Sequence, residues 1–212
     1  MKLVSRLFKR YPLLIAIAVL AFALRMYRIN TPLLDWHSWR QADTASVTRE
    51  YQKNGISLLY PKYHDVSDIP SGLPNPEGYR MVEFPLYNAL VAGILEVVPQ
   101  LPLVPTSRVV SSLFSIGTLI SLFFLVKSYY GKKAGYLTAF FFAVLPYSIF
   151  YSRVVLPEPF MVFFSTLSIT TFRFFLKRNS NTLYIVSLIS LALSFLLKPF
   201  TSFLSPVYFV IL

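Results

Sequence analysis

The chain is patterned as a series of apolar runs separated by short polar segments. The first run is 11–29, and the next four are 109–126, 134–152, 159–176 and 182–197. Since a helix needs about 20 mostly apolar residues to cross a bilayer, each run predicts a membrane-spanning helix. Another run begins near residue 200, and the sequence ends inside it. We therefore expect one all-helical transmembrane domain that is incomplete at its C-terminus.

A polar segment, 30–108, separates the first two runs and begins with a predicted helix. The stretch "HSWRQADTASVTREYQK" predicts this helix at about 37–53. Asp35 or Ser38 can cap its start, and Gly55 can end it because glycine accepts a left-handed conformation. The rest of the segment up to residue 80 is rich in Pro and Gly, which predicts an ordered loop with a short strand at 56–60.

A second helix is expected at 84–98, "FPLYNALVAGILEVV". It is apolar, but it is short for a span and carries Asn88 and Glu96. Such a segment is typical of a helix that lies at the membrane interface. The long segment therefore contains two juxtamembrane helices and no span.

Charge supports this topology through the positive-inside rule. If 84–98 does not cross, the short outer loops between the later spans keep only Arg153 and Lys198, and the cytoplasmic stretches hold Lys2, Arg6, Lys9, Arg10, Lys127, Lys132, Lys133, Arg173, Lys177 and Arg178. All nine acidic residues then face the outside. We expect an integral protein of the plasma membrane with a cytoplasmic N-terminus and an extracytoplasmic site.

Composition narrows the class of protein. Only 14% of residues are charged, against about 25% in ordinary soluble proteins, and there is no cysteine. The absence of cysteine excludes disulfides and Cys-based metal sites. The net charge of +11 does not predict nucleic-acid binding, because the basic residues lie between apolar runs rather than in one polar domain.

Ionisable groups collect at the outer level of the predicted bundle. They are Asp35, His37, Arg40, Asp43, Glu83, Arg153, Glu158 and Lys198. Carboxylates beside cations at a membrane surface suit a reaction on a lipid-linked phosphate. A carboxylate can accept the proton of an attacking hydroxyl, and Arg or Lys can bind the leaving phosphate.

Each of these residues also has a structural interpretation. Asp35 can be a helix cap, and Arg40 with Asp43 can be a surface ion pair. A carboxylate such as Glu158 is favoured at a helix start in any protein. The residue pattern alone therefore defines a polytopic membrane protein with a charged outer site.

The ordered motifs resemble the GT-C membrane glycosyltransferases, in particular the protein O-mannosyltransferase and aminoarabinose-transferase superfamily. "LLDWHSWRQADTASVTREYQKNG" is similar to the acidic motif and first juxtamembrane helix of that family, and "VEFPLYNALVAGILEVVP" to the second. "YYGKKAGY", "SRVVLPEP" and "LSFLLKPF" resemble its cytoplasmic turn, an outer acidic loop and a span that ends in Lys. The resemblance covers nearly the whole chain.

The resemblance implies transfer of a sugar from a polyprenyl-phosphate donor to a protein or lipid acceptor. The adjacent Asp-Glu pair that is usual in the family is missing, and Arg40-Gln41 occupy its positions. The general base is then Asp35, which we favour, or Asp43. Among the other candidates, Glu158 and Glu83 would orient the acceptor or hold a divalent metal, Arg153 and Lys198 would bind the donor phosphate, and His37, Arg40 and Gln41 would contact substrate. Metal use is left open.

Two other classes of function fit the sequence. A transporter or flippase fragment would place ionisable residues within its spans, whereas the predicted spans are free of acids. A catalytically inactive membrane assembly protein is the second alternative, because the missing Asp-Glu pair removes a family feature.

Overall fold

The computed structural model describes residues 10–69 and 71–211, and within them the regular elements are helices. The elements are α2 (Pro12–Met26), α3 (Ser38–Asn54), α4 (Leu86–Val97), α5 (Leu103–Val144), α6 (Pro146–Tyr151), α7 (Glu158–Arg178), α8 (Asn181–Leu197), the 3-10 helix η1 (Pro199–Leu204) and α9 (Ser205–Ile211). The expected all-helical fold class is confirmed. Lys2, Arg6 and Lys9 lie outside the described residues.

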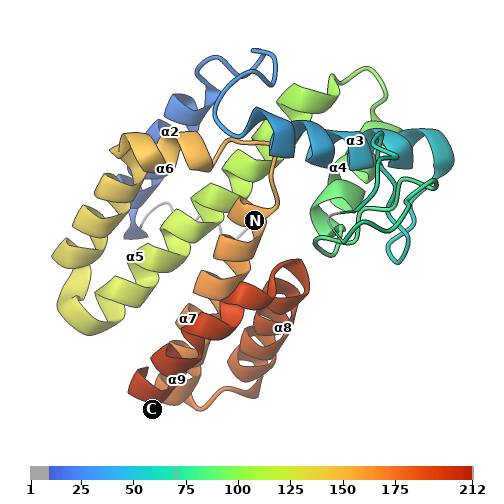
Figure 1. Ribbon diagram of the computed structural model, residues 1–212. Helices are drawn as coiled ribbons and strands as arrows, with labels where there is room; N and C mark the ends of the chain where they lie inside the picture. Colours follow the sequence, from blue (N-terminus) through green and yellow to red (C-terminus); the bar gives the residue numbers. More distant parts are fainter. Residues whose placement is uncertain (1–9, 70, 212) are drawn as a thin grey trace.

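The long helix α5 is divided at Gly131, whose φ of 84° and ψ of 176° are not helical. Its two arms run in opposite directions and turn at the lower left of Figure 1. They are in close contact, since the ring of Phe123 lies 5.0 Å from that of Tyr136. A Cβ on Gly135 would lie 2.9 Å from the carbonyl oxygen of Phe123, so the second arm needs glycine there.

The first helix, α2, packs against both arms of α5. Their shared core consists of Tyr11, Leu14, Ile17, Ala21, Leu119, Phe123, Ala139 and Ala143. A second core lies under α3 and α4 and consists of Ala45, Tyr87, Val91, Leu95, Val110 and Val155. Because Val110 belongs to α5 and Val155 precedes α7, this core attaches the two short helices to the bundle. In Figure 1, α3 runs across the upper end of the long helices.

Arg25, near the end of α2, is completely buried. Its Nε donates to Ser152 at 2.8 Å, and its Nη1 donates to the carbonyl of Ala143 at 3.3 Å. Its Nη2 donates to the carbonyl of Phe142 at 3.3 Å and to Ser148 at 3.1 Å. The predicted span 11–29 has this arginine near its end. In the structure its guanidinium donates to carbonyl groups in the last turn of α5 and to a side chain of α6.

Basic residues gather at the opposite end of the bundle from α3. The Lys177 ammonium donates to the carbonyl of Ser128 at 2.6 Å, and the Arg173 guanidinium lies 4.2 Å from the centre of the Tyr129 ring. Lys127 donates to the hydroxyl of Tyr11. The turn in α5, the end of α7 and the start of α2 thus share one positively charged end.

Two helices, α5 and α7, are long and apolar enough to cross a membrane by length and composition, while α2, α4, α8 and the η1–α9 segment are shorter apolar helices. α4 has 12 residues. At about 1.5 Å per residue it is about 18 Å long, against a hydrocarbon core of about 30 Å.

Three local expectations are corrected. Residues 56–60 form no strand, and an isolated bridge instead joins Lys62 to Tyr79. The N-cap of α3 is His37, in the left-handed conformation, with no side-chain capping bond. Asp35 does not cap the helix because its carboxylate accepts a hydrogen bond from the side chain of Gln41 instead. Gly55 ends α3 as expected, with φ of 87°.

Candidate active site

Four charged side chains from four segments meet where α3, α4, α7 and α8 approach one another. Arg40 of α3 lies 3.1 Å from Glu158, measured from Nη2 to Oε1. Lys198, just after α8, donates to the same oxygen at 2.6 Å. Oε2 of Glu83, just before α4, lies 3.7 Å from Arg40 Nη2 and 4.0 Å from Lys198 Nζ. We call Arg40, Glu83, Glu158 and Lys198 the charged cluster.

Helix ends explain why two of these residues meet. Glu158 is the first residue of α7, where the helix dipole favours a negative charge. Lys198 is the C-cap of α8, where the dipole favours a positive charge. Because α7 and α8 are antiparallel neighbours joined by a short turn, the start of one lies beside the end of the other.

The charged cluster is partly removed from water. The side chains of Glu83 and Lys198 are 8% and 14% exposed. Oε2 of Glu83 and Oε2 of Glu158 are buried and have no hydrogen-bond partner among the described residues. Since buried carboxylate oxygens strongly favour a donor, both atoms are ready to accept a hydrogen bond from a bound molecule.

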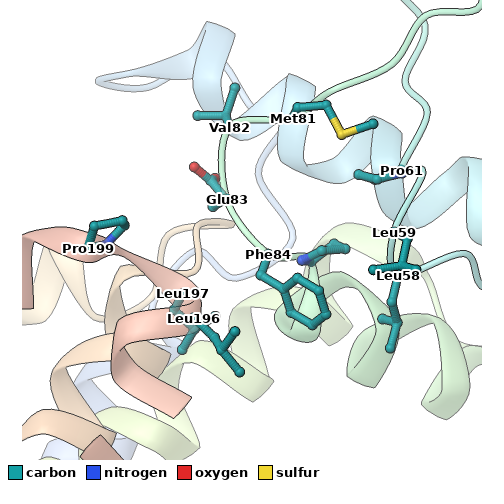
Figure 2. A pocket seen from close by; sticks show the side chains of 11 residues that line it. Leu58, Leu59, Pro61, Met81, Val82, Glu83, Phe84, Leu196, Leu197 and Pro199 are labelled. Atoms are coloured by element: carbon teal, nitrogen blue, oxygen red, sulfur yellow. The ribbon is translucent and has the colours of Figure 1, made fainter. Parts of the chain in front are cut away.

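Two cavities adjoin the charged cluster on either side of the segment that precedes α4. The first, of about 270 Å³, is lined mainly by apolar side chains. In Figure 2, Leu196, Leu197 and Pro199 lie on the left, Leu58, Leu59 and Pro61 lie on the right, and Glu83 and Phe84 lie between them. We call it the apolar cavity.

The second cavity, of about 800 Å³, lies between α3 and the loop that follows it, and its wall combines charged, polar and aromatic side chains with apolar ones. Arg40 belongs to its wall, as do Met81 and Val82, which also line the apolar cavity. We call it the polar cavity. Within the charged cluster, Glu83 therefore lines the apolar cavity and Arg40 lines the polar cavity.

Asp43, one of the two candidates for the base, lines the polar cavity. Its Oδ2 lies 3.0 Å from Nη1 of Arg80, which comes from the loop. Arg40 is bonded to Glu158 and not to Asp43, so the helix-surface ion pair considered from the sequence is absent. Arg40 and Asp43 both line the polar cavity but have different partners, Glu158 and Arg80.

Asp35, the other candidate, belongs to a separate network. Its Oδ1 accepts from Gln41 Nε2 at 2.6 Å, and its Oδ2 lies 4.0 Å from Nη2 of Arg108. Gln41 is completely buried, and its Oε1 accepts from the backbone N–H of Val155 at 3.1 Å. Both the nitrogen and the oxygen of the Gln41 amide are therefore hydrogen-bonded within the protein. The bond to Val155 connects α3 to the segment that precedes Glu158.

The remaining candidates lie apart from the charged cluster. Arg153 donates to the backbone carbonyl of Tyr27 and makes no ion pair within the described part of the chain. The exposed ring of His37 packs edge-on against Trp36, at 5.4 Å between ring centres. Neither side chain is brought to Lys198 in this structure.

The donor set does not suit a divalent metal. Glu83 and Glu158 already have Arg40 and Lys198 beside them, and these two positive charges would repel a cation. Within 10–69 and 71–211 no group of three His, Asp or Glu residues could hold a metal ion. Oxygen-rich ligand sets of the kind that Ca²⁺ or Mg²⁺ prefers are therefore not found there.

Three arginines that shape the site were not recognised from the sequence. Arg80 holds Asp43, Arg25 holds α6, and Arg108 donates to the carbonyl of Ile29 at 2.7 Å. The role of Arg108 could have been predicted from the sequence, because an arginine at the start of an apolar helix needs hydrogen-bond acceptors. Arg80 lies in a loop, where no periodicity marks it.

Fold and site together define a helical membrane protein with a charged site at the ends of its helices, between an apolar and a polar cavity. Residues 85–212 match the family model described as dolichyl-phosphate-mannose-protein mannosyltransferase. The match covers more than half of the chain, so this protein belongs to that family of GT-C glycosyltransferases. The resemblance seen in the sequence is confirmed.

The matched region contains part of the site only. It begins one residue before α4 and includes Glu158 and Lys198. Arg40, Asp43 and Glu83 precede it, so family membership does not by itself assign them a role. No curated protein matches the chain.

Proposed function

We propose that this protein transfers a sugar from a polyprenyl-phosphate donor to an acceptor hydroxyl at the extracytoplasmic membrane surface. The observation that carries this proposal is the charged cluster, with two cations and two carboxylates between an apolar and a polar cavity. The apolar cavity suits the lipid chain of a polyprenyl-phosphate donor, the two cations suit its phosphate, and the polar cavity has room for a hydroxyl-rich substrate.

The donor phosphate is assigned to Lys198 and Arg40. The side chain of Lys198 is largely buried, and an ammonium or guanidinium group in such a place binds a phosphate by charge-assisted hydrogen bonds. The first part of the lipid chain would lie in the apolar cavity beside Leu196 and Phe84. Arg153, assigned to the phosphate from the sequence, stays a candidate to be tested by substitution.

In the proposed reaction the acceptor oxygen forms a bond to the anomeric carbon of the donor sugar. The bond between that carbon and the phosphate oxygen breaks, and its electron pair leaves with the polyprenyl phosphate. The hydroxyl proton passes to a carboxylate of the protein. Stabilisation of the leaving phosphate by Lys198 and Arg40 is the main contribution, as is usual where negative charge develops.

The geometry supports Asp43 over Asp35 as the carboxylate that accepts the proton. Asp43 lines the polar cavity that also contains Arg40, and Arg80 orients it. Asp35 is instead held by Gln41 and does not line either cavity. Asp43→Asn is therefore expected to reduce transfer by about 10²–10⁴-fold, and Asp35→Asn by much less.

The proposed topology places the charged cluster outside and the basic end of the bundle inside. Cysteine labelling can test this directly, because the chain has no native cysteine. Asn30→Cys and Gln100→Cys should react with an impermeant thiol reagent on intact cells, and Lys133→Cys should not. Reaction of Lys133→Cys but not of Gln100→Cys would mean that 84–98 spans the membrane and would refute this topology.

The activity test uses the full chain in phosphatidylcholine vesicles with radiolabelled polyprenyl-phosphate mannose. A peptide rich in Ser and Thr and a set of neutral saccharides serve as acceptors, and label in the water-soluble product is counted. Lys198→Gln should lower transfer by about 10²–10³-fold. Lys53→Gln, at an exposed position on α3, is the matched control. Undiminished transfer by both Lys198→Gln and Arg40→Gln would refute the assignment of the charged cluster.

A further inference from the structure

The polar cavity has the size and composition of a small-molecule site. Its volume of about 800 Å³ lies within the range of about 300–1,000 Å³ that is usual for ligand pockets. Aromatic rings of Trp39, Tyr63 and Tyr79 belong to its wall, together with the carboxylates of Asp65 and Asp68. Aromatic faces pack on the C–H faces of sugar rings, and carboxylates accept hydrogen bonds from hydroxyl groups.

The wall of the polar cavity is held in place by bonds within the loop. Asn75 donates to the carbonyl of Tyr79 and accepts from its N–H, at 3.0 Å and 2.9 Å. The guanidinium of Arg80, which is bonded to Asp43, lies 5.2 Å from the centre of the Tyr63 ring. Because these side chains are already ordered, a ligand would lose little free energy in ordering them.

Several backbone groups of this loop are already bonded within the loop, which disfavours an extended peptide as the ligand. The N–H of Tyr63 donates to Gly78 at 2.8 Å, and the N–H of Arg80 donates to Pro61 at 2.9 Å. The N–H of Ile69 donates to Leu73 at 3.0 Å. A peptide that binds by strand addition needs free backbone groups in a row, whereas these bonds leave mainly side chains to face a ligand.

We propose that the polar cavity binds the acceptor and that the acceptor is a neutral saccharide. This inference rests on the proposed function, because the charged cluster, which includes Arg40, would hold the donor that supplies the activated sugar. The cavity extends from Asp43, beside the charged cluster, to Asp68 in the loop. A saccharide bound there has one hydroxyl near the carboxylate that is to accept its proton.

Tryptophan fluorescence offers a direct test, since the chain has two tryptophans and Trp39 lines the polar cavity. In Trp36→Phe, Trp39 becomes the sole reporter. The full-length variant is placed in phosphatidylcholine nanodiscs, without glycoside detergents that would compete. It is titrated with mannobiose, cellobiose and chitobiose, with a peptide rich in Ser and Thr, and with polyprenyl-phosphate mannose.

A saturable fluorescence change with at least one free saccharide, weakened about tenfold or more by Asp68→Ala, is the expected result. Glu96→Ala, an exposed carboxylate on α4 outside the cavity, should leave the titration unchanged. A response to the peptide alone would overturn the saccharide assignment. A response only to polyprenyl-phosphate mannose would assign the cavity to the donor sugar and also overturn it.

The label-transfer assay separates the two proposals. Transfer to the peptide without any saccharide response at Trp39 would refute the saccharide acceptor and leave the glycosyltransferase assignment intact. Saccharide binding at Trp39 without consumption of any labelled donor would instead refute the proposed function.

Discussion

Removal of the Arg25 guanidinium is expected to be one of the most destabilising single substitutions in this protein. The residue is 0% exposed and has six hydrogen-bond contacts, to side chains and carbonyls of α2, α5 and α6. Arg25→Met keeps the length and apolar part of the side chain and removes only the polar head. It therefore tests the hydrogen bonds together with the positive charge that makes them.

The magnitude follows from the partners that are left behind. A buried acceptor without a donor costs about 1–3 kcal/mol, and Ser152, Phe142 and Ala143 would each lose the donor that Arg25 supplies. The losses are not additive, because the three acceptors share one group and the structure can relax around Met. We expect the free energy of unfolding to fall by about 3–5 kcal/mol.

The assay is unfolding of the full chain in mixed micelles by added SDS, followed by circular dichroism. Arg28→Met is the matched control, because Arg28 is an exposed arginine three positions further along the same segment. The control should change the free energy of unfolding by about 0.5 kcal/mol or less. A loss under 1 kcal/mol for Arg25→Met, or equal losses for both variants, would refute the assigned role of these bonds.

Four further predictions concern single positions. Gln41→Leu should lower the free energy of unfolding in SDS by about 1–3 kcal/mol, because it leaves the buried N–H of Val155 without an acceptor. Gly131→Ala should cost about 1–3 kcal/mol in the same assay, because its φ of 84° and ψ of 176° suit glycine alone. Gly93→Ala, at a helical position with no atom within 4 Å of the new Cβ, should instead be neutral or slightly stabilising. The hydrogen bond from Lys62 lowers the pKa of Glu77. The stability that this bond contributes is therefore complete above the unfolded pKa of about 4.3, and it is lost as the pH falls through the lower pKa of the folded state. The rate of amide hydrogen exchange in the loop that contains Glu77, corrected for intrinsic rates, should rise in the parent protein as the pH falls below the folded pKa of Glu77. The Glu77→Gln variant should show no such rise.

Several features of the fold follow from local sequence alone. Apolar runs predict helices wherever they occur, and Gly131, which two lysines follow, lies at the turn in α5, where only glycine adopts the backbone angles without strain. Gly55 ends α3 for a related reason. The charge asymmetry along the chain separates a basic end from an acidic one before any contact is known.

Side-chain partners were predictable only where helix ends impose them. Glu158 and Lys198 were both expected at the same level, and they form a direct bond at 2.6 Å. The partner of Asp43 was not predictable, because Arg80 lies 37 positions away in an irregular loop. The position of a loop residue depends on how the whole loop packs, which no local periodicity encodes.

The sequence by itself determined a helical membrane protein with its acidic residues kept apart from the basic residues of the predicted cytoplasmic stretches. These properties depend on composition and short-range pattern, which the hydrophobic effect and helix geometry translate directly into structure. Only the tertiary structure decided that Arg40 faces Glu158, that Asp43 faces the polar cavity and that Arg25 is buried. Those outcomes depend on which helices pack together and on how they are placed along one another. A shift of a few ångströms takes a side chain out of reach of one partner and brings it to another.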